Sequence, residues 1–204
     1  MNKRNMHNIK QLLLSVSLTM TMTVTACGTT APTRFYTLSN TYQSAPSPTS
    51  YKTIDLRPVK VPERFKRPQI VLNSATSPQL ILLENERWGA MFDDELHDAI
   101  YSELTHLVAP TQKAYQVNVT LQQLQVIKGQ SVQADFSWKV QSLNTISSDV
   151  KADATLCQFD TQQMIGNSVD AVVQGMQKVV TQLSNKIAQH IKTLDTGTAP
   201  DCEP

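Results

Sequence analysis

The sequence predicts an α+β fold, a two-layer sandwich in which two long helices cover one face of an antiparallel sheet. Apolar residues alternate with polar ones over residues 115–126, 132–140 and 150–156, which is typical of strands with one buried face. Apolar residues recur every three to four positions over residues 86–108 and 168–194, which is typical of helices with one buried stripe. Helices and strands segregated in this way are expected to pack as two layers.

The N-terminal part of the domain is expected to add shorter strands. Residues 33–38 form the first of them, and residues 40–50, which are rich in Ser, Thr and Pro, form an irregular loop. The second strand covers residues 54–61 and is interrupted by a proline, so we expect an edge or bulged strand. Residues 69–72 and 79–84 are expected to pair as a hairpin.

Each predicted helix has a recognisable start. The stripe of the helix over residues 86–108 begins at Trp88, and three acidic residues lie in its first turns, where the helix dipole favours them. The helix over residues 168–194 is preceded by Asn167, which together with Asp170 resembles a capping pair.

The three alternating stretches between the helices are expected to form a meander. Its first strand changes parity between Leu121 and Leu124, which predicts a β-bulge. In its third strand Leu156 falls on the apolar side, so Cys157 is expected to face away from the helices.

Residues 1–26 have the features of a lipoprotein signal peptide. A basic leader precedes an apolar run of about 13–15 residues, which is too short to span a bilayer. The run ends in Val24-Thr25-Ala26-Cys27, which looks like the bacterial lipobox. This resemblance implies that Cys27 becomes the acylated first residue of the mature chain, that this covalent lipid is its only cofactor-like group, and that residues 27–32 form a tether. The alternative is an ordinary cleaved signal followed by a chance cysteine.

Composition narrows the classes of partner. Removing residues 1–26 from the 204 leaves 178 residues, enough for one domain with a real core. The mature chain has 15 basic and 17 acidic residues, so nothing indicates nucleic acid as a partner.

With Cys27 set aside, two cysteines remain, Cys157 and Cys202. Because an exported chain folds in an oxidising compartment, they are candidates for a disulfide. No cluster of cysteine and histidine in the sequence indicates a metal site.

The sequence contains no recognisable catalytic motif, and we do not expect an enzyme. Asp93, Asp94 and His97 are the only close group of acids and histidine, at a spacing that places them on one helical face. Such a group could hold a metal or transfer a proton. It lies off the apolar stripe, however, so a solvated, ion-paired face is expected. His106 and His190 stand alone on separate helices.

The most unusual stretch for an exposed turn is Arg64, Phe65, Lys66 and Arg67, which lies between two prolines. Aromatic residues and arginine anchor protein interfaces, so Phe65 between bases would suit a partner-binding turn. An equal alternative is that Phe65 folds back onto the core while the bases contact solvent. Trp88 is expected to be a core residue, and a contact with a partner is its alternative.

Two stretches carry a resemblance to a known family. Residues 59–71, VKVPERFKRPQIV, and residues 85–92, NERWGAMF, resemble the ABC-type transport auxiliary lipoproteins, the PqiC-like family. Members carry a V-x-V-P-x-Y-L-like turn, an R-P-Q-I-V-like strand and an R-W-x-x-P-L-like helix start. The lipobox and the order of strands and helices are similar as well, so the resemblance spans nearly the whole mature chain.

The resemblance implies a non-catalytic periplasmic lipoprotein with its family domain over residues 33–194, and the polar stretch 195–204 is expected to be a flexible tail. It implies docking to a periplasmic MCE-domain protein that carries lipid between the envelope membranes. Gly28, rather than aspartate, follows the lipidated cysteine, which implies the periplasmic face of the outer membrane. The alternative is a pilot or assembly lipoprotein for an outer-membrane β-barrel or secretin. Homo-oligomerisation is left open.

Overall fold

The computed structural model separates Met1–Pro32 from a compact unit, Thr33–Pro204, which holds every helix and strand discussed below. The signal peptide, Cys27, most of the tether, the loop at residues 40–50 and most of the strand expected at 150–156 lie outside the described residues. No helix in the described part is long and apolar enough to cross a membrane. The structure describes residues 31–39, 54–109, 113–143, 155–197 and 202.

The first of two sheets has the strand order β1-β4-β3. It consists of β1 (Arg34–Tyr36), β3 (Gln69–Asn73) and β4 (Leu80–Trp88). β3 and β4 are antiparallel, which confirms the predicted hairpin, while β1 runs parallel to β4. β4 continues to Trp88 and is therefore longer than its apolar residues alone predict.

The second sheet has the order β2-β5-β6-β7 and forms one layer of the sandwich. It consists of β2 (Ile54–Leu56), β5 (Tyr115–Ile127), β6 (Ser131–Ser142) and β7 (Cys157–Met164). β2 is parallel to β5 and the others pair antiparallel. The register of β5 shifts between Leu121 and Gln123, which confirms the predicted bulge. Both sheets are mixed, which corrects the expectation of one antiparallel sheet, while the α+β class holds.

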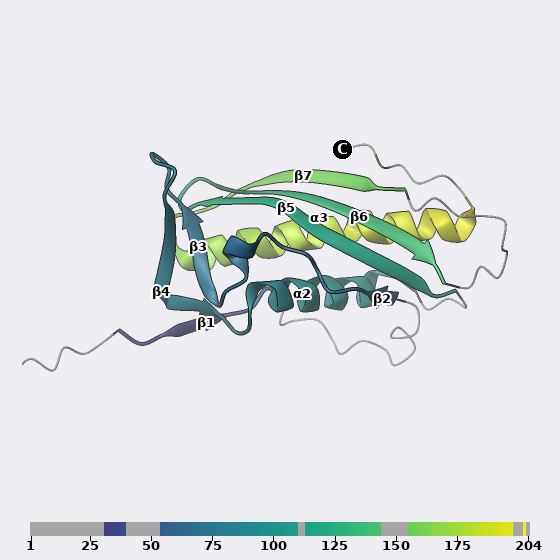
Figure 1. Cartoon of the computed structure of the whole chain (residues 1–204), viewed down its shortest axis with the longest axis horizontal. Helices are drawn as coiled ribbons and strands as arrows, with labels where there is room; N and C mark the ends of the chain where they lie inside the picture. Colours follow the sequence, from purple (N-terminus) through teal and green to yellow (C-terminus); the bar gives the residue numbers. More distant parts are fainter. Residues whose placement is uncertain (1–30, 40–53, 110–112, 144–154, 198–201, 203–204) are drawn as a thin grey trace, which may run out of the picture. The chain divides into compact units, whose positions relative to one another are not determined.

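The second layer is a pair of helices, α2 (Phe92–Leu107) and α3 (Val169–Thr196), which pack against each other. Figure 1 shows β5, β6 and β7 lying along α3. α3 contacts β6 and β7, and α2 contacts β2, the strand at the opposite edge of this sheet. The predicted helices are confirmed as elements, with ends that differ from the prediction.

Both helix starts need correction. Trp88 is the last residue of β4, and α2 begins only at Phe92. The periodicity over residues 86–92 misled because one strand residue and one helix residue both point into the core. At α3, the cap is Ser168 rather than Asn167, since the Ser168 hydroxyl accepts a hydrogen bond of 3.0 Å from the Ala171 amide.

A buried carboxylate fastens the chain after β1 to α2. Glu95, which is 9% exposed, accepts hydrogen bonds from the Thr37 hydroxyl at 2.9 Å and from the Leu38 amide at 3.0 Å. A Cβ at Gly89 would lie 2.9 Å from the Glu95 Oε1 atom, so a larger residue at this position would displace the carboxylate. These hydrogen bonds join the chain after β1 to the first turn of α2.

The third strand of the meander is the main correction to the predicted sheet. β7 begins at Cys157, and Leu156 is 52% exposed just before it. Cys157 pairs with Trp138 of β6, and cross-strand partners share a face of the sheet. Trp138 faces the core, so Cys157 faces the helices, opposite to the predicted parity.

Candidate functional site

The basic turn, Arg64–Arg67, begins within a short 3-10 helix, η2 (Glu63–Phe65), and continues through a tight bend. Pro62 precedes it, and the Phe65 amide donates to the Pro62 carbonyl at 2.9 Å. The Arg67 amide donates to the Phe65 carbonyl at 2.7 Å, and the Trp88 amide donates to the Pro68 carbonyl at 2.7 Å. The turn is therefore fixed at both ends, and its backbone needs little further ordering to bind a partner.

The basic side chains of this turn differ in their exposure, and the Nε atom of Arg67 is buried. Arg64 and Lys66 are exposed, and Arg67 is half-buried. Lys66 Nζ lies 3.0 Å from the Glu63 carboxylate, and this contact raises the pKa of Lys66. The Arg64 guanidinium carbon lies 4.9 Å from the centre of the Phe65 ring. Three bases against one acid leave the turn with net positive charge.

The two aromatic residues proposed as partner contacts are core residues. Phe65 and Trp88 are each 3% exposed. Their rings lie 6.2 Å and 5.8 Å from the ring of Phe92, which joins them into one aromatic cluster. The expectation of Phe65 as an exposed binding knob is thus corrected, because its ring fills the space beneath the turn. The alternative in which it folds back onto the core is confirmed.

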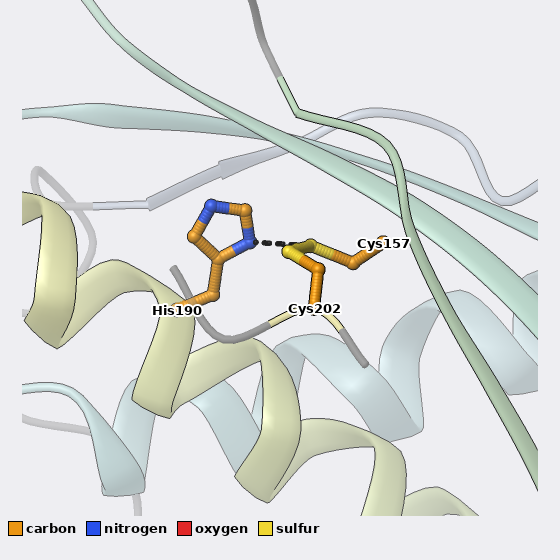
Figure 2. A group of neighbouring side chains, drawn as sticks. All are labelled: Cys157, His190 and Cys202. Carbon is orange, nitrogen blue, oxygen red and sulfur yellow. Dashed lines mark hydrogen bonds between the residues drawn. A yellow bond between two sulfur atoms is a disulfide. The ribbon is translucent and has the colours of Figure 1, made fainter. Parts of the chain in front are cut away.

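A second candidate is a buried group of Cys157, His190 and Cys202, drawn in Figure 2. The two cysteines are joined as a disulfide that spans 45 residues of sequence. His190 of α3 is 4% exposed, and its Nδ1 atom lies 3.3 Å from the Cys157 sulfur. The disulfide ties the segment after α3 to the start of β7, on the helix side of the sheet.

The hydrogen bonds of His190 fix its protonation state. The Trp138 indole N–H donates to His190 Nδ1 at 3.1 Å, so Nδ1 accepts and the ring proton is on Nε2. Burial lowers the pKa of His190, which favours the neutral ring. Both sulfurs are bonded to each other and Nδ1 already has a donor. The group is thus a covalent clasp with a neutral histidine packed on it, and in this state it offers no metal-binding set.

Helical spacing alone indicates that His190 is buried. His190 lies three residues after Ile187 and next to Ile191, so helical spacing places it on the buried stripe of α3. A histidine on such a stripe needs a polar partner, and Trp138 provides the donor.

The acidic group near the start of α2 does not form a site. His97 Nδ1 lies 3.2 Å from Asp98 rather than from Asp93 or Asp94, and its Nε2 lies 3.3 Å from the Leu56 carbonyl. Asp94 is exposed and Asp93 half-buried. His106 is exposed near the other end of the helix. The His97 ring is therefore directed toward Asp98 and β2, and Asp93, Asp94 and His97 do not converge on one point.

These features define a class of protein: a small α+β domain with a fixed basic turn, a disulfide-clasped end and no assembled catalytic group in its described part. A model of the ABC-type transport auxiliary lipoprotein component matches residues 36–188, and the chain belongs to this family. The family is not a known class of enzyme, and membership places the protein in the cell envelope as a membrane-anchored lipoprotein.

Solved structures have the same fold. A crystal structure of an uncharacterised protein superposes with a TM-score of 0.59 at 17% identity, covering 79% of this chain and 99% of the other. A crystal structure of a Xanthomonas campestris protein from the family DUF330 gives a TM-score of 0.53 at 14% identity, covering 80% of this chain and 96% of the other. The sequence matches none of the curated proteins with which it was compared.

Proposed function

We propose that this chain is a lipoprotein of the outer membrane, facing the periplasm, that docks the periplasmic MCE-domain component of an intermembrane lipid transport system. The observation that carries the proposal is the family match over residues 36–188, which defines an auxiliary component of a transporter. An auxiliary component without a catalytic group acts by binding, and Cys27 provides the attachment to the membrane.

The basic turn is the proposed docking surface, with its role now limited to its charges. Arg64, Lys66 and Arg67 lie on a fixed backbone and would steer the turn toward an acidic surface of the partner. Phe65 and Trp88 hold this turn in place from beneath and do not touch the partner in this proposal.

Two measurements test the proposal. Wild-type protein should fractionate with outer membranes, and Cys27→Ala should release it as a soluble or unprocessed chain. A soluble wild-type protein whose Cys27 is unmodified by mass spectrometry would contradict the anchoring.

Binding of the purified MCE component should weaken when Arg64, Lys66 and Arg67 are all changed to Glu.

The matched control reverses three exposed lysines elsewhere, Lys128, Lys139 and Lys192, which produces the same change in net charge. Equal loss of binding in both variants would mean a general charge effect. Unchanged binding in the basic-turn variant would place docking on another surface. Phe65→Ala, by contrast, should lower the melting temperature, because the ring is buried.

A further inference from the structure

In the part of the chain that the structure describes, no strand pairs with the outer edge of β7. β7 is the last strand of its sheet, and within the described residues it pairs only with β6. Open edges of this length are usually blunted by proline, lysine or a bulge. β7 has none of these and carries one charged residue, Asp160.

The direction of the backbone groups along β7 can be assigned. The Ile165 amide, one residue beyond the strand, donates to the Gln130 carbonyl on the β6 side at 3.0 Å. Backbone groups of an antiparallel strand point to alternate sides at successive residues. The amide and carbonyl groups of Gln158, Asp160 and Gln162 therefore point outward, toward the open edge.

A groove runs beside this edge between β7 and α3. It consists of two adjoining hollows of about 380 and about 360 Å3 that share Gln182. The Gln182 side-chain oxygen accepts hydrogen bonds from Thr161 at 2.8 Å and from Gln163 at 3.2 Å, so the floor of the groove is polar and fixed. Figure 1 shows β7 and α3 running alongside each other.

Charges mark the two sides of the edge differently. On the helix side, Lys178 lines one hollow and Lys186 the other; both are exposed, and neither belongs to a salt bridge among the described residues. On the outer face, Asp160 pairs in register with Asp135 of β6 and lines a polar hollow with it. Like charges directly across a strand pair destabilise it. The edge thus offers positive charge on one face, and on the other a pair of aspartates that has no salt bridge among the described residues.

We propose that β7 accepts an extended segment of a partner protein as an added strand, with acidic side chains facing α3 and a basic side chain facing Asp160. Strand addition of this kind obtains its affinity from main-chain hydrogen bonds and its specificity from alternate side chains. Lys186 lies eight residue steps after Lys178, a rise of about 12 Å along a helix, and four strand residues span about 13 Å. Two acidic residues of the added strand would therefore face Lys178 and Lys186 if they lie four positions apart.

A second copy of this chain fits the edge less well. Antiparallel pairing of two β7 strands around their middle places the two Asp160 carboxylates opposite each other or two residues apart. The same lysines of two copies would also face one shared groove. An added strand of a different protein avoids both repulsions, and this assignment does not depend on the partner proposed above.

The test uses the full-length protein in detergent and a short peptide with the core Glu-Thr-Val-Lys-Glu flanked by threonines. Hydrogen exchange should show added protection of residues 158–164 when the peptide is present at millimolar concentration. Gln162→Pro should abolish this protection, because it removes an outward amide while leaving pairing with β6 in place. Gln162→Ala, which keeps the amide, is the matched control.

Charge exchange provides a readout that does not depend on the proline variant. Changing both Lys178 and Lys186 to Glu should lower the affinity of the protein for the peptide about tenfold. A peptide of opposite charge, with the core Lys-Thr-Val-Glu-Lys, should bind the variant with Glu at both positions and regain part of the lost affinity. Absence of protection at β7, or equal binding by both peptides to both proteins, overturns the proposal. It is also overturned if β7 is protected without peptide in a dimer that Gln162→Pro dissociates, since the occupant is then a second copy.

Discussion

Strands β6 and β7 lie side by side in one sheet, yet different kinds of contact hold them in the fold. β6 buries five apolar side chains against the helices. β7 buries only Cys157 fully, and the rest of its inner face meets α3 through Phe159 and hydrogen bonds from Thr161 and Gln163 to Gln182. Backbone pairing joins the two strands; beyond it, β6 is held by the hydrophobic effect, and β7 by a covalent bond, one aromatic ring and hydrogen bonds to an amide. An edge held in this way can keep its polar groove open to solvent.

The largest expected difference comes from two phenylalanines that face each other across the strand pair. Phe136 of β6 is 3% exposed, and its partner Phe159 of β7 is partly buried. Phe136→Ala should lower the free energy of unfolding by about 3–5 kcal/mol, because it empties a packed core position. Phe159→Ala should cost clearly less. Urea denaturation of both variants measures the difference, and equal losses would mean that the two strands are held alike.

Removing the disulfide should destabilise the domain next most strongly. The bond closes a loop of 45 residues, and a crosslink of that length is worth about 4 kcal/mol in the chain-entropy model, with measured values of about 2–4 kcal/mol. Cys202→Ser should lower the melting temperature and raise hydrogen exchange in β7 more than in β6. Reduction of the wild type should reproduce the effect, and reductant should not affect the variant further. If β6 loses protection to the same degree, the clasp stabilises the whole sheet.

The pH dependence of stability should depend on His190. Burial lowers its folded-state pKa below the ordinary value of 6.5, so the unfolded chain binds the proton more readily. The stability that the neutral ring provides is present above about pH 6.5 and is lost as the pH falls toward the folded-state pKa, at no more than about 1.4 kcal/mol per pH unit. His190→Gln should flatten this part of the stability curve, and His106→Gln, at an exposed position, should not. A curve unchanged by His190→Gln would assign the dependence to other groups.

The smallest effect is expected at the cap between β7 and α3. Ser168→Ala removes the hydroxyl that accepts from the Ala171 amide and should cost about 1 kcal/mol. Exchange should rise in the first turn of α3 and at the end of β7, while β6 stays protected. Asn167→Ala, one residue earlier, should change stability by less, and a larger effect there would restore Asn167 as the cap.

The same contrast explains which elements the sequence could predict. In β6 the alternation from Val132 to Val140 has no exceptions, because every inner position fills the core, and the bulge in β5 left a clear change of parity. β7 carries mostly polar residues on both faces, so its sequence gives little periodic signal. The alternating stretch before it ends at Leu156, which is exposed, and the predicted strand was therefore placed too early.

The candidate site was predicted only in part for a related reason. Spacing identified the turn at Arg64–Arg67, but burial of Phe65 depends on Phe92, 27 residues later, and no local pattern contains that contact. The sequence identified Cys157 and Cys202 as a possible disulfide. The face of the sheet predicted for Cys157 was wrong, because the strand was expected to end at Leu156 and instead begins at Cys157. The buried carboxylate of Glu95 was missed because its partners, Thr37 and Leu38, belong to a distant segment.

The parallel pairing of β1 with β4 has a mechanical consequence. A force applied through a lipid on Cys27 would enter the domain along β1, whose hydrogen bonds to β4 lie across the direction of pull. Such bonds are loaded together in shear rather than opened one after another. Glu95 adds two further bonds just after the strand, at Thr37 and Leu38. If the chain is anchored at Cys27 as proposed, β1 would resist tension, so that a pull from the membrane would move the domain as a whole instead of peeling away its first residues.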